Sequence, residues 1–278
     1  MNPRELIRDT GEFFRKAGVP DPEYDAAQLL SRLCGQAPLS LRLDTDTVLD
    51  EDTLSLFRTL RDRRAGREPL QYILREAPFC GYVFYVDPRV LIPRPETELL
   101  CEWALEIISG KNRPNVLDLC CGSGCLGISI KLHAPFTSVL ASDISDDALD
   151  VAKLNASRLS ANVRFVQSDL FSAVADGLFD LIVSNPPYIP SSACDTLQQE
   201  VLREPRIALD GGKDGLSLYR KICREAPLHL VPGGSLLLEI GDAESDEVAS
   251  MMNDAGFSSI IVRNDYRSVP RMITGILT

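Results

Sequence analysis

Residues 184 to 190 read SNPPYIP, and they follow FDLIV, a short apolar run that predicts a buried strand. Each proline fixes its own φ, pushes the residue before it into an extended conformation and carries no N–H. The segment is therefore a rigid rim on which the side-chain oxygen of Asn185 and the carbonyl of Pro186 are acceptors. Two converging acceptors can hold a planar NH₂ group by both hydrogens, and Tyr188 adds a flat face. This rim suits alkylation of an amide-like nitrogen, which reacts poorly until it is aimed at an electrophile.

A glycine-rich loop is the second candidate site. The run NVLDL leads into CCGSGCLG, where Gly122, Gly124 and Gly127 satisfy G-x-G-x-x-G. Such glycines permit a tight turn and a close approach of the backbone to a ligand at the start of a helix. Asp143 ends the next predicted strand, SVLASD, where its carboxylate can accept from both hydroxyls of a ribose. Nicotinamide dinucleotides and S-adenosylmethionine both fit this pattern; Asp118, four residues before Gly122, favours the second, but the loop alone does not decide between them.

Alternating strand and helix signals must position these residues. From Asn115 onward the runs NVLDL, SVLASD, VRFVQSD, FDLIVSN and GGSLLLEIG predict strands, and helical stretches such as SDDALDVAKLNASRL separate them, with Ser145 as an N-cap. This alternation predicts an α/β fold with a parallel sheet whose ligands bind outside the carboxyl ends of the strands. The SNPPY segment then lies at the functional edge of the sheet.

The chain before this sheet has a different pattern. Leu6, Ile7, Phe13, Phe14 and Ala17 recur at helical spacing, and PEYDAAQLLSRL and DTLSLFRTLRDRR predict two further helices. We therefore expect a helical recognition domain over residues 1–75. GYVFYVD and VLIP carry strand signals and predict a hairpin connector over 76–95, and ETELLCEWALEIISG predicts the helix that opens a second domain over 96–278.

Composition excludes several classes of function. The 278 residues carry a net charge of −11, and the 17 basic and 27 acidic residues after Arg75 place about −10 of it on the second domain. This balance argues against tracking a nucleic-acid backbone, which needs Lys and Arg. The two histidines, His133 and His229, argue against a histidine-rich metal site, so we expect no metal. The eight cysteines form no C-x-x-C pair and the N-terminus has no apolar signal core, which favours a cytoplasmic protein with reduced thiols and no membrane partner.

Several blocks in order resemble the HemK-like glutamine methyltransferases that modify peptide chain release factors. They are EPLQYI, FCGYVFYVDPRVLIPRPETE, VLDLCCGSG, the Asp143 strand end, SDLF, SNPPYIP, EVLREPRIALDGGKDGL and LVPGGSLLLEIG. The resemblance implies a Rossmann-like class I methyltransferase domain with a mostly parallel seven-stranded sheet and an antiparallel strand near RMITGIL. It also implies transfer of methyl from S-adenosylmethionine to the side-chain nitrogen of the glutamine in a Gly-Gly-Gln motif, leaving S-adenosylhomocysteine. The partner is then a release factor, no nucleic acid is required, and the chain acts as a monomer.

The resemblance also assigns residues. Asn185, Pro186 and Tyr188 act in catalysis, and substrate binding adds Pro187, Arg94 and Glu98. Cofactor binding falls to residues at the ends of four predicted strands: Asp118, Cys120, Cys121, Gly122, Ser123, Gly124, Asp143, Ile144, Asp169, Leu170 and Asn185. Cys120 stands where the family usually has glycine. We expect the small thiol to be accommodated if φ is negative there, whereas a positive φ would be costly. Leu170 stands where some relatives carry an aromatic residue.

Other substrates and other classes of function are also compatible with some of these residues. A glutamine of a ribosomal protein or the exocyclic amine of adenine would need the same rim, although IPRPETE favours the release-factor branch and the acidic second domain disfavours nucleic acid. A nicotinamide dehydrogenase or a non-catalytic binding module would leave the rim without a use. The arginines between Arg58 and Arg67 favour a solvated helix face over a partner surface. Gly211, Gly212 and Gly215 predict a loop near the pocket, to which we assign no chemistry.

Overall fold

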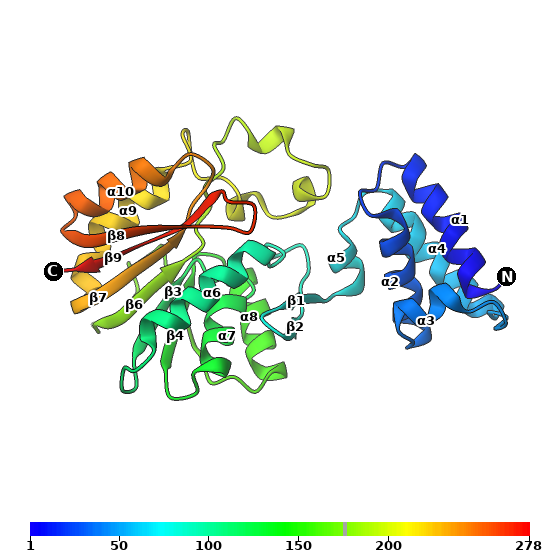
Figure 1. Cartoon of the computed structure of the whole chain (residues 1–278), viewed down its shortest axis with the longest axis horizontal. Coiled ribbons are helices and arrows are strands. Elements are labelled where there is room, and N and C mark those ends of the chain that lie inside the picture. Colours follow the sequence, from blue (N-terminus) through cyan, green and yellow to red (C-terminus); the bar gives the residue numbers. More distant parts are fainter. Residues whose placement is uncertain (175–176) are drawn as a thin grey trace. The chain divides into compact units, whose positions relative to one another are not determined.

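The structure, a computed structural model, describes residues 1–174 and 177–278 and divides into two compact units. The first, here called the helical unit, comprises Met1–Glu76 together with the distant segment Gln198–Arg203. The second, here called the sheet unit, comprises Ala77–Leu197 and Glu204–Thr278 (Figure 1).

Helices make up the helical unit: α1 (Pro3–Lys16), α2 (Pro22–Cys34), α3 (Pro38–Leu43), α4 (Glu51–Ala65) and α5 (Leu70–Leu74). The three helices predicted from periodicity are confirmed as α1, α2 and α4, whereas the short α3 and α5 were not predicted. Local chemistry sets the ends: the Asn2 side chain accepts from the Glu5 N–H at 2.8 Å in a capping box, and Gly35 ends α2 in the left-handed conformation. The apolar faces meet in a core around Phe14 and Phe57, both fully buried.

The four arginines of α4, and Arg67 just after it, are paired with carboxylates. Arg64 is only 4% exposed, and its guanidinium contacts Asp25 at 2.7 Å and Glu200 at 2.9 Å. Arg67 binds the same Glu200, 2.7 Å from its Nε. The other three pair with nearby side chains, namely Arg58 with Glu51, Arg61 with Asp62 and Arg63 with Glu68. The interpretation as a solvated face is therefore wrong for Arg64, which closes the unit onto the Gln198–Arg203 segment.

A seven-stranded sheet forms the centre of the sheet unit, in the order β5-β4-β3-β6-β7-β9-β8. Its strands are β3 (Asn115–Leu119), β4 (Ser138–Asp143), β5 (Arg164–Gln167), β6 (Phe179–Ser184), β7 (Leu230–Glu239), β8 (Phe257–Asn264) and β9 (Pro270–Leu277). Only β9 runs antiparallel to its neighbours β7 and β8. The five predicted strands and the antiparallel strand near RMITGIL are confirmed, with β7 beginning three residues before the predicted GGSLLLEIG.

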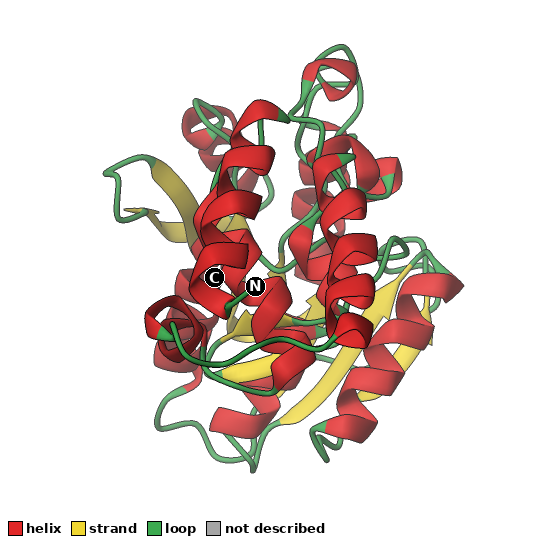
Figure 2. Cartoon of the chain, turned by 90° about the vertical axis from the view of Figure 1, so that its right-hand side faces the viewer, coloured by secondary structure: helices red, strands yellow, loops and turns green. Residues whose placement is uncertain are grey.

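Helices cover both faces of this sheet (Figures 1 and 2). On one face α6 (Pro95–Ile108) and α7 (Cys125–His133) pack Trp103 and Ile128 against Val116 of the sheet, and α8 (Asp146–Arg158) lies beside them. On the other face α9 (Ser217–Glu225) and α10 (Ser245–Asp254) pack Ile222 and Met252. Ser145 caps α8 as predicted, accepting from the Ala148 N–H at 3.2 Å.

Short elements complete the chain. The hairpin is β1 (Ala77–Phe79) paired with β2 (Tyr82–Phe84), and four single 3₁₀ turns span Cys194–Thr196, Val201–Arg203, Arg206–Ala208 and Ala226–His229. The strand signal of VLIP at 90–93 is wrong: Val90 closes a turn by donating its N–H to the Asp87 carbonyl, residues 91–93 have no regular secondary structure, and Pro93 has no N–H for pairing. Within residues 1–174 and 177–278, the helices all fall short of the length and apolarity that crossing a membrane requires.

Candidate active site

A cavity of about 360 Å³ opens at the carboxyl ends of the parallel strands, within the size range of cofactor sites. The cavity therefore lies at the edge of the sheet that the alternation of strands and helices predicted. Residues from the loops after four strands line it, and among those singled out by sequence are Asp118, Cys120, Cys121, Gly122, Ser123, Asp143, Ile144, Asp169, Leu170, Asn185, Pro187 and Arg94. Gly124, Pro186, Tyr188 and Glu98 are not among the lining residues.

Asp118 anchors the glycine loop from below. Its carboxylate is 1% exposed and accepts from the Gly127 N–H at 2.8 Å, which ties the end of β3 to the first turn of α7. A Cβ on Gly127 would lie 2.8 Å from the same oxygen, so only glycine fits there. Burial raises the pKa of Asp118 to about 7, and the Gly127 hydrogen bond opposes the shift. Asp118 therefore shapes the loop through buried contacts.

Asp143 joins two loops at the cavity. One carboxylate oxygen accepts from the Gly122 N–H at 2.8 Å and the other from the Ser145 N–H at 3.0 Å. Burial raises the pKa of Asp143, and these two N–H groups oppose the shift. A carboxylate has about four acceptor sites, so two remain for the hydroxyls of a ligand. This arrangement suits recognition of a ribose diol.

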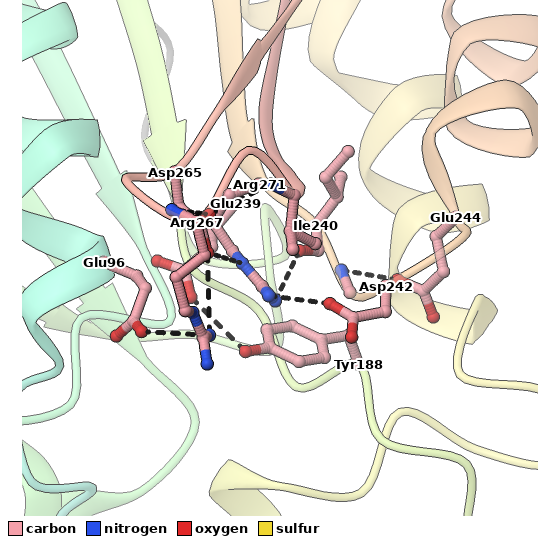
Figure 3. Close-up of polar contacts among 11 residues, drawn as sticks. Glu96, Tyr188, Glu239, Ile240, Asp242, Glu244, Asp265, Arg267 and Arg271 are labelled. Carbon is pink, nitrogen blue, oxygen red and sulfur yellow. Dashed lines mark hydrogen bonds and ion pairs between the residues drawn. The ribbon is translucent and has the colours of Figure 1, made fainter.

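The rim after β6 is held from two sides. Ser184 donates its hydroxyl to the Leu119 carbonyl at 2.7 Å, which fixes the strand end. Asn185 lines the cavity together with Thr97 of α6, and it donates its amide hydrogen to the Thr97 hydroxyl at 3.1 Å, which leaves its side-chain oxygen available as an acceptor. Tyr188 instead turns its hydroxyl toward Glu239 of β7, at 3.4 Å (Figure 3). Burial, followed by the charge of Glu239, raises the pKa of this phenol. Tyr188 does not line the cavity in this structure, so the expected packing of its ring on a ligand has no contact here that supports it.

The loop of Gly211, Gly212 and Gly215 supports the rim from behind, a role that sequence reasoning missed. Ile189 N–H donates to the Leu209 carbonyl at 2.9 Å, and Gly211 N–H donates to the Ile189 carbonyl at 2.8 Å. A Cβ on Gly211 would lie 2.7 Å from Cα of Tyr188, so glycine is needed where the two segments touch.

Arg94 and Glu98 take different places. Arg94 lines the cavity and pairs with the buried Glu204 at 2.6 Å, and Glu204 also accepts from the Ile92 N–H. Burial raises the pKa of Glu204, while the charge of Arg94 opposes the shift. Glu98 accepts from the Cys80 N–H at 2.8 Å, and so it closes the β1–β2 turn instead of the cavity. Of this predicted pair, the structure brings only Arg94 to the cavity.

Comparison with known proteins identifies the family of this chain. Residues 97–213 match the Methyltransferase small domain model and residues 5–74 match the PrmC N-terminal domain model. The chain is 39% identical to a release factor glutamine methyltransferase of Geobacter sulfurreducens, over 98% of this chain and 95% of that protein. It is 42% identical to one of Chlorobaculum tepidum, over 96% and 94% respectively. The chain belongs to the release factor glutamine methyltransferase family.

Solved structures place the sheet unit of this family member among the class I methyltransferases. A methyltransferase from Pyrococcus furiosus aligns with a TM-score of 0.51 and 20% identity, over 69% of this chain and 87% of that one. The T. thermophilus 16S rRNA N2 G1207 methyltransferase, solved with AdoMet and guanosine, aligns with a TM-score of 0.54 and 19% identity, over 73% and 50%. These similarities show the fold. Membership of the release factor glutamine methyltransferase family excludes the interpretation as a nicotinamide dehydrogenase.

Cys120 adopts the left-handed backbone conformation that favours glycine. Its φ is +57°, which is the case expected to be costly for a residue with a side chain. Burial raises the pKa of the thiol to about 12, which leaves it uncharged and a weak nucleophile.

We expect Cys120→Gly to raise the free energy of unfolding by about 1 kcal/mol. The left-handed conformation costs an L-residue about 1–2 kcal/mol, and the freedom of glycine in the unfolded chain offsets part of that gain. Urea unfolding measures the change. Cys121→Gly is the matched control, because Cys121 is buried, has no positive φ and should only lose stability. A less stable Cys120→Gly would mean that packing of the thiol outweighs the backbone strain.

Proposed function

We propose that this chain transfers the methyl group of S-adenosylmethionine to the side-chain amide nitrogen of the glutamine in the Gly-Gly-Gln motif of peptide chain release factors. The observation that carries the proposal is the hydrogen bond from the NH₂ group of Asn185, a residue that lines the cavity, to the Thr97 hydroxyl, because it leaves the side-chain oxygen of Asn185 free to accept. The names of relatives that are 39% and 42% identical over nearly full length support the same acceptor.

The cavity suits the proposed cofactor. Asp143 would accept from the ribose hydroxyls, Ile144 and Leu170 would flank the adenine, and the backbone of the Cys120–Gly122 loop would approach the methionine end. A Cβ on Gly122 would meet no atom within 4 Å, so the loop leaves open space beside it. When bound, S-adenosylmethionine supplies a methyl group on a positively charged sulfur.

The residues of the rim would act mainly by positioning. The lone pair of an amide nitrogen is delocalised, so the glutamine is a weak nucleophile. The Asn185 oxygen and the Pro186 carbonyl would hold both hydrogens of its NH₂ group, which aims the nitrogen and favours its pyramidal form. As the N–C bond formed, the methyl–sulfur bond would break with its electron pair left on sulfur, and the alkylated nitrogen would be acidic enough to release one of these protons to the rim or to water.

We also propose that residues 1–75 form the domain that recognises the release factor, and that residues 76–95 connect it to a methyltransferase domain over 96–278. The described helical unit supports the first of these, since it has its own core around Phe14 and Phe57. The proposal includes a monomeric, cytoplasmic protein.

The direct test is transfer of labelled methyl from S-adenosylmethionine to a purified release factor, beside a copy in which the Gly-Gly-Gln glutamine is replaced. We expect label on the intact factor alone. Equal labelling of both copies would move the acceptor to another residue. Labelling of neither, with S-adenosylmethionine still bound, would bring forward a ribosomal protein or nucleic acid as the substrate.

A further inference from the structure

We propose that Thr97 and Glu239 are positioning residues that decide which end of the Asn185 amide faces the substrate. The inference rests on the proposed function and deepens it, because it assigns the orientation of the rim to two residues outside the SNPPY segment. Neither residue touches the acceptor nitrogen in this scheme; both act through Asn185.

Three separate elements meet in this chain of hydrogen bonds. Thr97 stands in the first turn of α6, Glu239 ends β7, and Asn185 follows β6. The Thr97 hydroxyl donates to one oxygen of Glu239 at 2.7 Å and accepts from the Asn185 NH₂ at 3.1 Å. Thr97 is 4% exposed and Glu239 is 1% exposed, so water does not compete for these bonds.

The direction of each bond follows from the charge of Glu239. An ionised carboxylate can only accept, so the single proton of the Thr97 hydroxyl must point to it. The hydroxyl oxygen can then only accept from Asn185, which engages the NH₂ group and leaves the side-chain oxygen of Asn185 as the acceptor available to a substrate. A protonated Glu239 can donate instead, and this frees Thr97 to donate to the Asn185 oxygen. The amide could then flip and present a donor where the substrate also has donors.

Titratable and charged side chains from several elements lie near Glu239, among them Tyr188, Arg271 and Glu96 (Figure 3). Tyr188 donates to its second oxygen at 3.4 Å, and Tyr219 of α9 donates to its backbone carbonyl at 2.8 Å. Arg271 of β9 brings a positive charge, and Arg271 itself pairs with Asp242 at 2.7 Å and lies 3.7 Å from Asp265. Glu96 of α6 brings a negative charge, partly balanced by Arg267 at 3.4 Å.

These surroundings place the titration of Glu239 near neutrality. Burial raises its pKa to about 7, the Thr97 hydrogen bond and Arg271 oppose the shift, and Glu96 adds to it. The ionised form predominates above this pH, so the productive orientation of Asn185 is favoured as pH rises. We therefore expect kcat to rise through about pH 7 and then level off.

The test compares Thr97→Val, Thr97→Ser and Glu239→Gln with wild type in methyl transfer to a release factor, between about pH 6 and pH 8. Thr97→Val removes the hydroxyl at nearly constant volume and should lower kcat about tenfold, with affinity for S-adenosylmethionine unchanged. Thr97→Ser keeps the hydroxyl and should restore most of the rate. Glu239→Gln can donate at every pH, so its rate should be low and should lose the rise near pH 7.

Thr274→Val is the matched control, because it removes another buried threonine hydroxyl, which bonds the Leu236 carbonyl at 2.9 Å, away from the rim. Its kcat should match wild type. A Thr97→Val protein that turns over like wild type, or a Glu239→Gln protein that keeps the rise near pH 7, would overturn the inference. The second result would point to Asp118, whose pKa is also raised to about 7. Absence of labelling by wild type would instead defeat the proposed function.

Discussion

Asn185→Ala should lower kcat for methyl transfer by about a thousandfold, while affinity for S-adenosylmethionine stays within a factor of about two of wild type. The substitution removes an acceptor that engages the nitrogen most strongly as positive charge develops on it, and loss of one such preorganised contact costs about 10²–10³ in rate. Single-turnover labelling of a release factor measures the rate, and calorimetric titration measures cofactor affinity.

Asn162→Ala is the control for this variant, because Asn162 is exposed in the turn before β5. It should leave both quantities unchanged. If Asn185→Ala kept the wild-type rate, the amide of the substrate would be held by other groups, and the role given to the rim would be wrong.

Asp143→Ala should weaken binding of S-adenosylmethionine by about a hundredfold, with kcat at saturating cofactor falling less than tenfold. In the proposed complex the substitution would remove two charged hydrogen bonds to the ribose, each worth about 1.5–3 kcal/mol before the loop adjusts. The same carboxylate also holds the Gly122 and Ser145 N–H groups, so the loop loses its tie to the end of β4. Because these contacts do not change along the reaction, the loss should appear in KM more than in kcat.

Asp150→Ala provides the comparison for Asp143, since this carboxylate lies on the exposed face of α8 and its pair with Lys153, at 3.8 Å, contributes little. Cofactor affinity should not change. A large fall in kcat for Asp143→Ala at saturating cofactor would show that Asp143 acts in the reaction as well as in binding.

The strands that carry the site could be predicted because each is a short, largely apolar run. NVLDL and SVLASD match β3 and β4 residue for residue, and both end at residues that line or adjoin the cavity. Strand alternation then placed Asn185 and Asp143 at one edge. VLIP carried the same apolar signal but forms no strand, because the Val90 N–H donates to the Asp87 carbonyl, the Ile92 N–H donates to Glu204 and Pro93 has no N–H.

The supporting residues could not be predicted from local patterns. Thr97 and Glu239 bond each other across 142 positions of the chain, and nothing in their neighbours marks the pairing. The charge of Glu239 at the end of the apolar run SLLLE was the one available signal, since a carboxylate at a strand end in the core needs a partner. The burial of Arg64 could not be predicted for the same reason. Its place among other arginines favoured an exposed side chain, whereas its second carboxylate partner, Glu200, lies far away in the sequence.

The helical unit is discontinuous in sequence, and this imposes an order on its completion during synthesis. Its first 76 residues are synthesised as one continuous stretch, but Gln198–Arg203 is synthesised more than a hundred residues later. At ordinary rates of elongation this delay is about ten seconds. Until Glu200 arrives, Arg64 has Asp25 as its carboxylate partner and Arg67 lacks the one it binds in the finished protein. The last ion pairs of the N-terminal helices can therefore form only after β3 to β6 have been translated.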